Sequence, residues 1–289
     1  MNSILYQDSA LNSFRLSRIS RIEAEVPFTG LGIKYVGSGR EVYFANDRKY
    51  RVEAGSYLIG NDFTRSIVHI NQPEPVRGIC IDISSQIIAE VVSSPVDRQS
   101  DITGFLLSDQ LLVNQYRTKN TGLGQCLEKI WRQLEAESHL QPAGEWLQED
   151  LFYTLAEHIV SDQCLVFKHL HKLKFRKSGT KGEIMRSLLL AREYMDDQLA
   201  ENPSLDEIAQ VSGISKYHFI RLFREVFAVS PYQYLKGRRL ELAKQELLKG
   251  KSVTEVAIGL GYFDSAAFSN AFKSKFGVPP QQAMAGKTP

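Results

Sequence analysis

Two segments in the C-terminal third of the chain place cationic, amide and hydroxyl side chains at helical spacing. Such side chains can recognise nucleic acid, because arginine pairs with guanine through two hydrogen bonds, asparagine pairs with adenine, and lysine contacts phosphates. The candidate DNA contacts are Lys216, Tyr217, Ile220, Arg221 and Arg224 in the first segment, and Ser265, Ala266, Ser269, Asn270, Lys273 and Lys275 in the second. For each of them, a solvated helix face is the alternative interpretation.

A repeated pattern surrounds these two segments. Phenylalanine recurs every four residues in both of them: Phe219, Phe223 and Phe227, then Phe268, Phe272 and Phe276. This spacing places each trio along one helix face, turned away from the candidate contacts. Short helices are expected before them, at 205–212 and 253–260. A short helix, a turn and a longer helix make a helix-turn-helix, and the chain carries two.

Cap signals support both units. Ser204–Glu207 and Ser252–Glu255 read as capping boxes, in which a serine caps the helix start and a glutamate reaches back. Gly213 and Gly261 tolerate the left-handed turn that ends a helix. We expect Ser215 and Asp264 to cap the two longer helices.

A long helix is predicted between the two units. Ser230 can cap it, and Pro231 suits its first position. Its length from Pro231 to Lys249 is about 28 Å, and major-groove faces recur about every 34 Å on one side of B-DNA. With some packing tilt, this spacing favours two recognition helices that read adjacent grooves. Arg238 and Arg239, on the same helix, serve either helix packing or phosphate contact.

Charge is unevenly distributed along the 289 residues. Residues 203–289 carry 12 Lys and Arg against 7 Asp and Glu, a net charge of +5, whereas the remainder has 23 against 26, a net charge of −3. A basic C-terminal part is typical of a nucleic-acid-binding module joined to another domain. Hydrophobic residues make up 43% of the chain, enough for packed cores.

The C-terminal hundred residues resemble the DNA-binding domain of the AraC/XylS family of bacterial transcription regulators. The resemblance is carried by LDEIAQVSGISKYHFIRLFREVFAVSPYQYLKGRRLELAKQELL and by SVTEVAIGLGYFDSAAFSNAFKSKFGVPPQQ. It implies base contacts at Tyr217, Ile220 and Arg221. Many relatives carry an arginine at the position of Asn270, so the second unit is expected to position the protein more than to specify sequence.

The residue composition of the N-terminal half is typical of a β domain. Residues 20–95 are rich in Tyr, Val, Ile and Phe, with turns expected at 37–39, 46–47 and 54–55 and a loop at Pro73 and Pro75. The stretch VGSGREVYFANDRKYRVEAGSYLI resembles the effector-binding cupin domain of arabinose-type family members. The resemblance implies a cupin (jelly-roll) fold that binds a small-molecule effector.

An effector pocket lined by aromatic side chains is expected in this domain. The candidates are Tyr35, Tyr43, Tyr57, Phe63 and His69, with ordinary core packing as the alternative. His69 is the one histidine between residues 20 and 95, so the histidine cluster of a metal-binding cupin is absent and no metal or cofactor is expected. The arginine that arabinose-type members carry near position 36 is replaced by Val36, which argues against a sugar.

Amphipathic helices are expected at 124–140 and 145–160, joined by a short turn at 141–144. They either cover the β domain or form a dimer interface. The basic stretch 167–182 follows and reads as an interdomain linker in which His169 and His171 are solvated. The expected domains are an effector-binding and dimerisation domain at 1–173, a linker at 174–182, and a DNA-binding domain at 183–289.

These observations predict an α+β chain: an N-terminal cupin-like domain with dimerisation helices, and an all-α domain of two helix-turn-helix units joined by a long helix. Its expected role is an effector-controlled, dimeric transcription regulator that binds double-stranded DNA. It acts as an activator, with RNA polymerase as a candidate partner, or as a repressor, and the sequence leaves that choice open. Three widely spaced cysteines and the lack of a secretory or membrane-spanning segment favour the cytoplasm and no membrane partner. No catalytic constellation is evident. The alternatives are a regulator whose β domain only dimerises, and a cupin enzyme fused to a DNA-binding domain.

Overall fold

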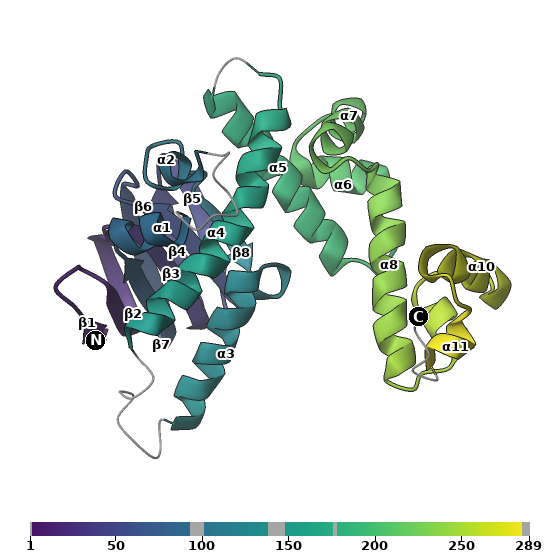
Figure 1. Cartoon of the computed structure of the whole chain (residues 1–289), viewed down its shortest axis with the longest axis horizontal. Coiled ribbons are helices and arrows are strands. Elements are labelled where there is room, and N and C mark those ends of the chain that lie inside the picture. The colour runs from purple at the N-terminus through teal and green to yellow at the C-terminus, as the bar shows by residue number, and fades with distance from the viewer. Residues whose placement is uncertain (1, 93–100, 138–147, 176–177, 285–289) are drawn as a thin grey trace. The chain divides into compact units, whose positions relative to one another are not determined.

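The computed structural model describes residues 2–92, 101–137, 148–175 and 178–284. The chain divides into two compact units, residues 1–168 and residues 169–289 (Figure 1). The turn predicted at 141–144 and residues 176–177 of the predicted linker lie outside the described residues. Within the described ranges, no helix combines the length and the apolar character needed to cross a bilayer.

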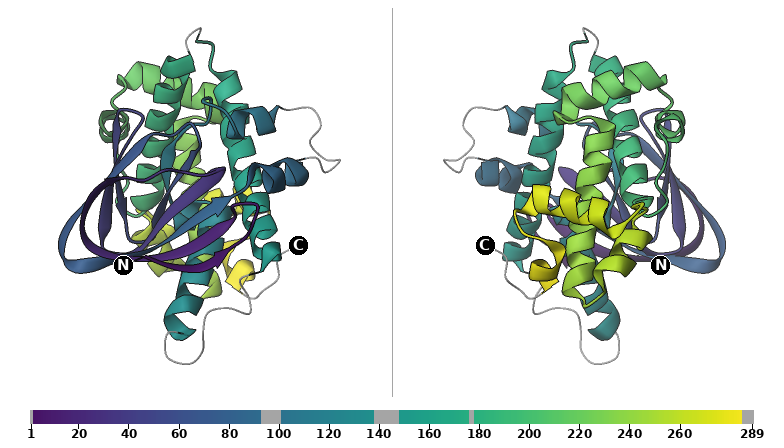
Figure 2. Two further views of the ribbon diagram at one scale, coloured as in Figure 1. Left: turned by 90° about the vertical axis from the view of Figure 1, so that its left-hand side faces the viewer. Right: turned by 90° about the vertical axis from the view of Figure 1, so that its right-hand side faces the viewer.

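The first unit is built around an antiparallel sheet (Figure 2). Its strands are β1 (Asn2–Gln7), β2 (Ser13–Glu25), β3 (Leu31–Ser38), β4 (Arg40–Ala45), β5 (Arg48–Glu53), β6 (Ser56–Asn61), β7 (Ser66–Ile83) and β8 (Asn114–Arg117). They run in the order β1-β2-β7-β3-β6-β8, and the β4–β5 hairpin joins through β4 to β7. The predicted turns are confirmed, because Gly39, Asn46, Asp47 and Gly55 all have positive φ angles.

Strand β3 is covered on both faces of the sheet. Every residue of β3 from Leu31 to Val36 is buried, so its alternate side chains enter two different cores. Val36 lies in the inner core with Phe28 and Leu58. The other face meets helices, where the rings of Tyr35 and Trp131 lie 5.9 Å apart.

Helices cover that outer face. They are α1 (Ser85–Val92), α2 (Ile102–Leu106), α3 (Gly122–Glu137) and α4 (Glu149–Lys172), with a 3-10 turn at Thr118–Asn120. The predicted apolar stripe of α3 is confirmed, since Leu127, Ile130, Trp131 and Leu134 are all buried. On α4, Leu155 and Ile159 are fully buried. The alternative in which these helices cover the β domain therefore accounts for their apolar faces.

The loop predicted at Pro73 and Pro75 is wrong. Both prolines lie within the continuous strand β7. In the β2–β7 ladder, Arg21 is paired with Asn71 and Ile19 with Val76, so residues 72–75 bulge opposite one residue of β2. A bulge leaves backbone N–H groups unpaired, and proline, which has none, is tolerated there.

The basic stretch 167–182 is more helical than predicted. Helix α4 extends to Lys172, and α5 (Ser178–Asp197) begins inside the predicted linker of residues 174–182. His169 is not solvated: its imidazole packs edge-on against Phe227 with ring centroids 5.0 Å apart. Burial, with the nearby charges of Lys172 and Arg192, lowers the pKa of His169 to about 4. The lysine-rich composition of this stretch gave no signal that α4 continues through it. Because the helix does continue, the imidazole ring of His169 lies against the apolar side chain of Phe227.

Six further helices complete the second unit. They are α6 (Leu205–Ser212), α7 (Lys216–Phe227), α8 (Pro231–Leu248), α9 (Val253–Gly259), α10 (Ser265–Phe276) and α11 (Pro280–Met284). Both predicted capping boxes are confirmed, and Ser230 forms a third with Gln233. Asp264 caps α10, whereas the Ser215 hydroxyl makes no capping hydrogen bond to α7.

The two phenylalanine trios form equivalent stacks. The ring centroids of successive members lie 5.5 and 4.5 Å apart along α7, and 5.7 and 4.5 Å apart along α10. The first two rings of each trio are fully buried; those of the second trio share a core cluster with Val256 and Ala257, and Ile208 and Ala209 are buried on the short helix of the first unit. The duplicated helix-turn-helix is therefore confirmed as two similar packing units.

A polar network fixes α5 against α8. The Asp196 carboxylate accepts hydrogen bonds from the Tyr234 hydroxyl at 2.9 Å and from Arg238 Nε at 2.7 Å. Arg239 Nε donates to the Leu199 carbonyl at 2.7 Å. Of the two roles considered for these arginines, helix packing accounts for Arg238 and for one nitrogen of Arg239.

Candidate nucleic-acid interface

The outer surface of α7 carries the first set of candidate contacts. Tyr217 is 89% exposed, and Arg221 and Arg224 are also exposed, whereas Ile220 is half-buried. The phenylalanine trio lies on the opposite side of the helix and holds it to α6. The helix thus offers a rigid, solvent-facing row of side chains at its N-terminal half, the end that enters a major groove in helix-turn-helix proteins.

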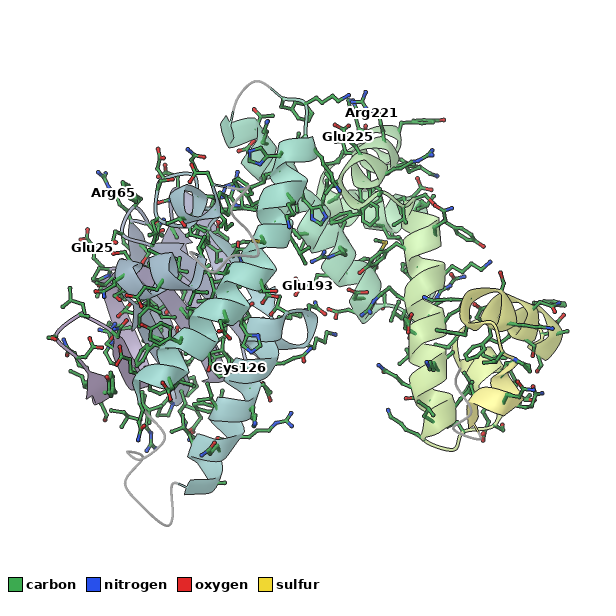
Figure 3. All side chains as sticks on the ribbon, in the orientation of Figure 1. Glu25, Arg65, Cys126, Glu193, Arg221 and Glu225 are labelled. Atoms are coloured by element: carbon green, nitrogen blue, oxygen red, sulfur yellow. The ribbon has the colours of Figure 1, made fainter. Side chains whose placement is uncertain are left out.

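Arg221 is the best placed of these residues for a base edge. It lies on α7 one turn before Glu225 (Figure 3), and within the described part of the chain no ion pair holds its guanidinium. A guanidinium that is not committed elsewhere loses no intramolecular partner when it pairs with guanine.

Lys216 is already engaged at the start of α7. Its ammonium lies 2.7 Å from Asp206 Oδ2 in the first turn of α6. This exposed pair links the first turns of the two helices, so a DNA contact by Lys216 has to compete with it.

The second recognition helix offers a less charged surface. Ala266, Asn270 and Lys273 are exposed on α10, and Ser265 and Ser269 are half-buried. The Asp264 carboxylate is engaged as the cap of α10, because its Oδ1 accepts the Ala267 N–H at 2.6 Å. Asn270 carries a side-chain amide on this helix, whose N–H and C=O groups can pair with adenine through two hydrogen bonds.

Lys275 is engaged in contacts within the protein. Its ammonium donates to the Gly237 carbonyl at 2.6 Å and lies 3.0 Å from Glu241 Oε1, so it fastens α10 to α8. Lys273 has no such partner among the described residues and is the lysine on α10 left for a phosphate. The sequence could not separate them, because Gly237 and Glu241 lie more than thirty residues away.

The predicted effector residues do not lie together. Tyr35 and Tyr57 face the helices, where the Tyr35 hydroxyl donates to Glu128 and the Tyr57 hydroxyl lies 2.7 Å from Thr121 Oγ1. Phe63 is exposed in the turn after β6, and His69 is half-exposed with its Nδ1 3.4 Å from Glu23. Of the five, Tyr43 alone belongs to the inner core.

Polar side chains that sequence reasoning missed accompany Tyr43. Its hydroxyl donates to Glu41 Oε2 at 2.6 Å, and burial raises the pKa of the Glu41 carboxyl. Lys34 is 1% exposed, with its ammonium 3.9 Å from Asp82 Oδ1 and 5.0 Å from the centre of the Phe28 ring. Among the described residues, Lys34 donates no hydrogen bond.

A buried ammonium without an acceptor is costly, because burial removes the water that would otherwise solvate it. The Asp82 carboxylate offsets part of this cost through its ion pair with the Lys34 ammonium at 3.9 Å, but its Oδ2 also accepts hydrogen bonds from Arg15 and Ser13. Cys80 lies in the same region, and burial raises the pKa of its thiol. The sequence signal was a lysine at an alternating position inside the apolar run LGIKYV. Across the described ranges, no group of three His, Cys, Asp or Glu side chains could hold a metal ion.

Two helix-turn-helix units, each with an exposed longer helix and joined by one straight helix, define the second unit as a double helix-turn-helix domain. Residues 208–285 match the family described as a helix-turn-helix domain. The regulatory protein SoxS of Salmonella typhimurium is 31% identical over 99 residues, which cover 34% of this chain and 90% of SoxS.

Other similar proteins extend the comparison. The transcriptional activator RhaS of Escherichia coli is 25% identical over 257 residues, covering 88% of this chain and 85% of RhaS. A crystal structure of an AraC-type DNA-binding regulator from Chromobacterium violaceum is 25% identical, with a TM-score of 0.34, and covers 38% of this chain and 95% of that one. Two further curated relatives are matched over 46% and 47% of their own length, so the chain spans about half of each. The chain belongs to the AraC/XylS family of transcription regulators.

Proposed function

We propose that this chain is a sequence-specific transcription regulator that binds double-stranded DNA with α7 and α10 in adjacent major grooves. One observation carries the proposal. The recognition helices α7 and α10 pack in the same way through their phenylalanine trios, and the single helix α8 joins their two units. Helix α8 has 18 residues and so is about 27 Å long. A modest tilt of each unit brings the two recognition helices to the spacing of about 34 Å between successive groove faces.

The two helices contribute differently. Arg221 reads a base, with Tyr217 and Ile220 beside it, and Arg224 contacts the backbone. On α10, Asn270 reads a base while Ala266, Ser265 and Ser269 allow close approach, and Lys273 contacts a phosphate. Lys216 serves as a secondary contact, and Lys275 supports α10 through α8.

The test is selection of genomic DNA fragments with the purified full chain at a stated salt concentration. The expected result is an enriched motif with two blocks about one helical turn apart. Enrichment without a motif, with affinity that falls steeply with salt, would mean backbone binding alone and would count against the proposal.

For the effector, we propose the inner core of the β domain around Lys34, Glu41 and Tyr43. The buried ammonium of Lys34, which pairs with Asp82 at 3.9 Å but donates no hydrogen bond among the described residues, supports a ligand that bears a carboxylate or another anionic group. A thermal-shift screen of small carboxylates with wild type and Lys34→Met tests this, since a ligand that binds the folded state raises its stability. A ligand that stabilises both variants equally binds elsewhere.

The same screen addresses the alternatives. If no small molecule raises the melting temperature, a β domain that only dimerises becomes the better interpretation. If a stabilising compound is chemically converted, the enzyme interpretation gains support. Effector binding would act by shifting the relative placement of the two units, and thereby operator choice.

We further propose a homodimer through the solvent-facing sides of α3 and α4, within the segment 124–165. Leu165, an apolar side chain that is 58% exposed on α4, supports this surface. Light scattering should give twice the chain mass for wild type and the single mass for Leu165→Glu. Activation through RNA polymerase is tested by a reporter fused to the selected site: its output rises for an activator and falls for a repressor.

A further inference from the structure

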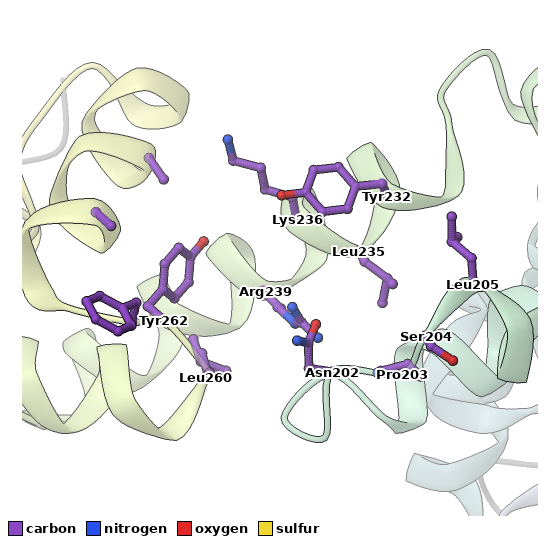
Figure 4. A pocket seen from close by; sticks show the side chains of 14 residues that line it. Asn202, Pro203, Ser204, Leu205, Tyr232, Leu235, Lys236, Arg239, Leu260 and Tyr262 are labelled. Carbon is purple, nitrogen blue, oxygen red and sulfur yellow. The ribbon is translucent and has the colours of Figure 1, made fainter.

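The second unit contains a cleft to which none of the candidate DNA contacts of α7 and α10 contributes a side chain. It has a volume of about 610 Å³ and lies between the two helix-turn-helix units, with α8 as its floor (Figure 4). One wall comes from the loop before α6 and the start of that helix, and the other from the turn between α9 and α10 together with Ala267 and Ala271 of α10. These walls are close, because a Cβ atom built on Gly261 would lie 3.9 Å from the Cβ atom of Asn202.

We propose that this cleft binds the DNA backbone between the two grooves, with one phosphate at Lys236 and its flanking deoxyriboses against the aromatic walls. The proposal rests on the proposed function, because it assigns the stretch of operator that neither recognition helix contacts.

Positive charge supports an anionic occupant. Lys236 is exposed on the floor, and no ion pair engages it within the described residues. Beneath it, Arg239 is held through Nε by the Leu199 carbonyl, while its Nη2 is shielded from water and has no acceptor. None of the described side chains that line the cleft is acidic. The charge of Arg239 is therefore uncompensated under the floor, where low dielectric strengthens its attraction for a phosphate.

The apolar walls distinguish a nucleic-acid backbone from a simple anion. Phe263 is 99% exposed and Tyr232 is 68% exposed, and Tyr262 also lines the cleft. Exposed rings of this kind are costly in water, and deoxyribose offers C–H surface on both sides of each phosphate. A free phosphate would use the cations and leave the rings uncovered.

The mouth of the cleft adjoins the elements that approach DNA. One wall includes Ser204 and Leu205 at the start of α6, and the Lys216–Asp206 pair links that first turn to the first turn of α7. The other wall includes Phe263, next to the cap of α10, and Ala267 in its first turn. Because the N-terminal turns of α7 and α10 enter the grooves, the cleft opens toward the backbone that connects them.

The experiment compares Lys236→Ala with Lys249→Ala in the full chain on the selected two-block operator. Lys249 caps the C-terminal end of α8, is paired with Glu246 at 2.8 Å and lies outside the cleft, so it is a charge-matched control. For Lys236→Ala, the slope of log affinity against log salt should become shallower by about 0.9, the value of one phosphate contact. The control should keep the wild-type slope, and both variants should keep the wild-type sequence preference.

A second readout locates the phosphate. Operators carrying a neutral methylphosphonate at each position between the two blocks are bound to wild type and to Lys236→Ala. One position should weaken wild-type binding several-fold and leave Lys236→Ala unchanged. Tyr232→Ala should weaken binding to the same operator without altering the salt slope, because it removes ring contact and not charge.

Several outcomes overturn the proposal. An unchanged slope in Lys236→Ala, or a chain indifferent to every methylphosphonate between the blocks, would show that the backbone does not enter the cleft. Stabilisation of wild type by inorganic phosphate alone, with an unchanged slope, would make the cleft a free-anion site instead. Failure of wild type to select a two-block motif would refute the proposed function itself, and is thus a distinguishable result.

Discussion

Replacing Arg221 with alanine separates base reading from general DNA affinity. Arg221 is exposed on α7, and its guanidinium makes no ion pair within the described residues, so its removal leaves the packing of the helix unchanged. The melting temperature should therefore stay at the wild-type value. A bidentate arginine–guanine pair contributes about 1–3 kcal/mol of discrimination. Arg221→Ala should thus reduce preference at one base pair by about 5- to 150-fold.

The assay is competition binding at fixed salt, with operators that carry each base substitution in turn. Wild type should show a preference at one position that Arg221→Ala lacks, while the remaining positions keep their order. Arg224→Ala, one turn further along α7, is the matched control and should weaken binding evenly across all operators. If Arg221→Ala also weakens every operator equally, Arg221 contacts the backbone and the assigned base contact is wrong.

Three predictions concern stability. Phe272→Ala should lower the free energy of unfolding by about 3–5 kcal/mol because its ring is fully buried, whereas Phe263→Ala should change it little; equal losses in chemical denaturation would contradict the packing described. Asp196→Ala should lower the free energy of unfolding by about 2 kcal/mol, because it leaves the Tyr234 hydroxyl without its acceptor. Asp206→Ala, which removes an exposed ion pair, should lower it by less than about 1 kcal/mol, and urea titration measures both. The pKa of His169 is lowered to about 4 in the folded chain, so between about pH 6.5 and pH 4 the unfolded chain binds a proton that the folded chain does not. The free energy of unfolding should therefore fall as the pH is lowered across that range, and His169→Leu should make this fall smaller.

The double helix-turn-helix was determined by the sequence itself. Capping boxes, the glycine turns and the phenylalanine trios are all signals between residues within four positions of one another. The backbone of a helix is set at the same range, so Ser204, Gly213 and Phe219 identify their element without knowledge of what packs on it.

Only the tertiary structure decided which side chains are free to act. Strand β3 is buried on both faces, so alternation could not tell that Lys34 enters the inner core while Tyr35 packs against α3. That choice depends on which layer covers each face of the sheet. Lys273 and Lys275 look equivalent in sequence, but the carbonyl and carboxylate that hold Lys275 come from α8. The cleft likewise forms only where the two helix-turn-helix units, which are similar in sequence, approach each other over α8. Contacts between residues distant along the chain set all three features, and a pattern confined to neighbouring residues cannot carry that information.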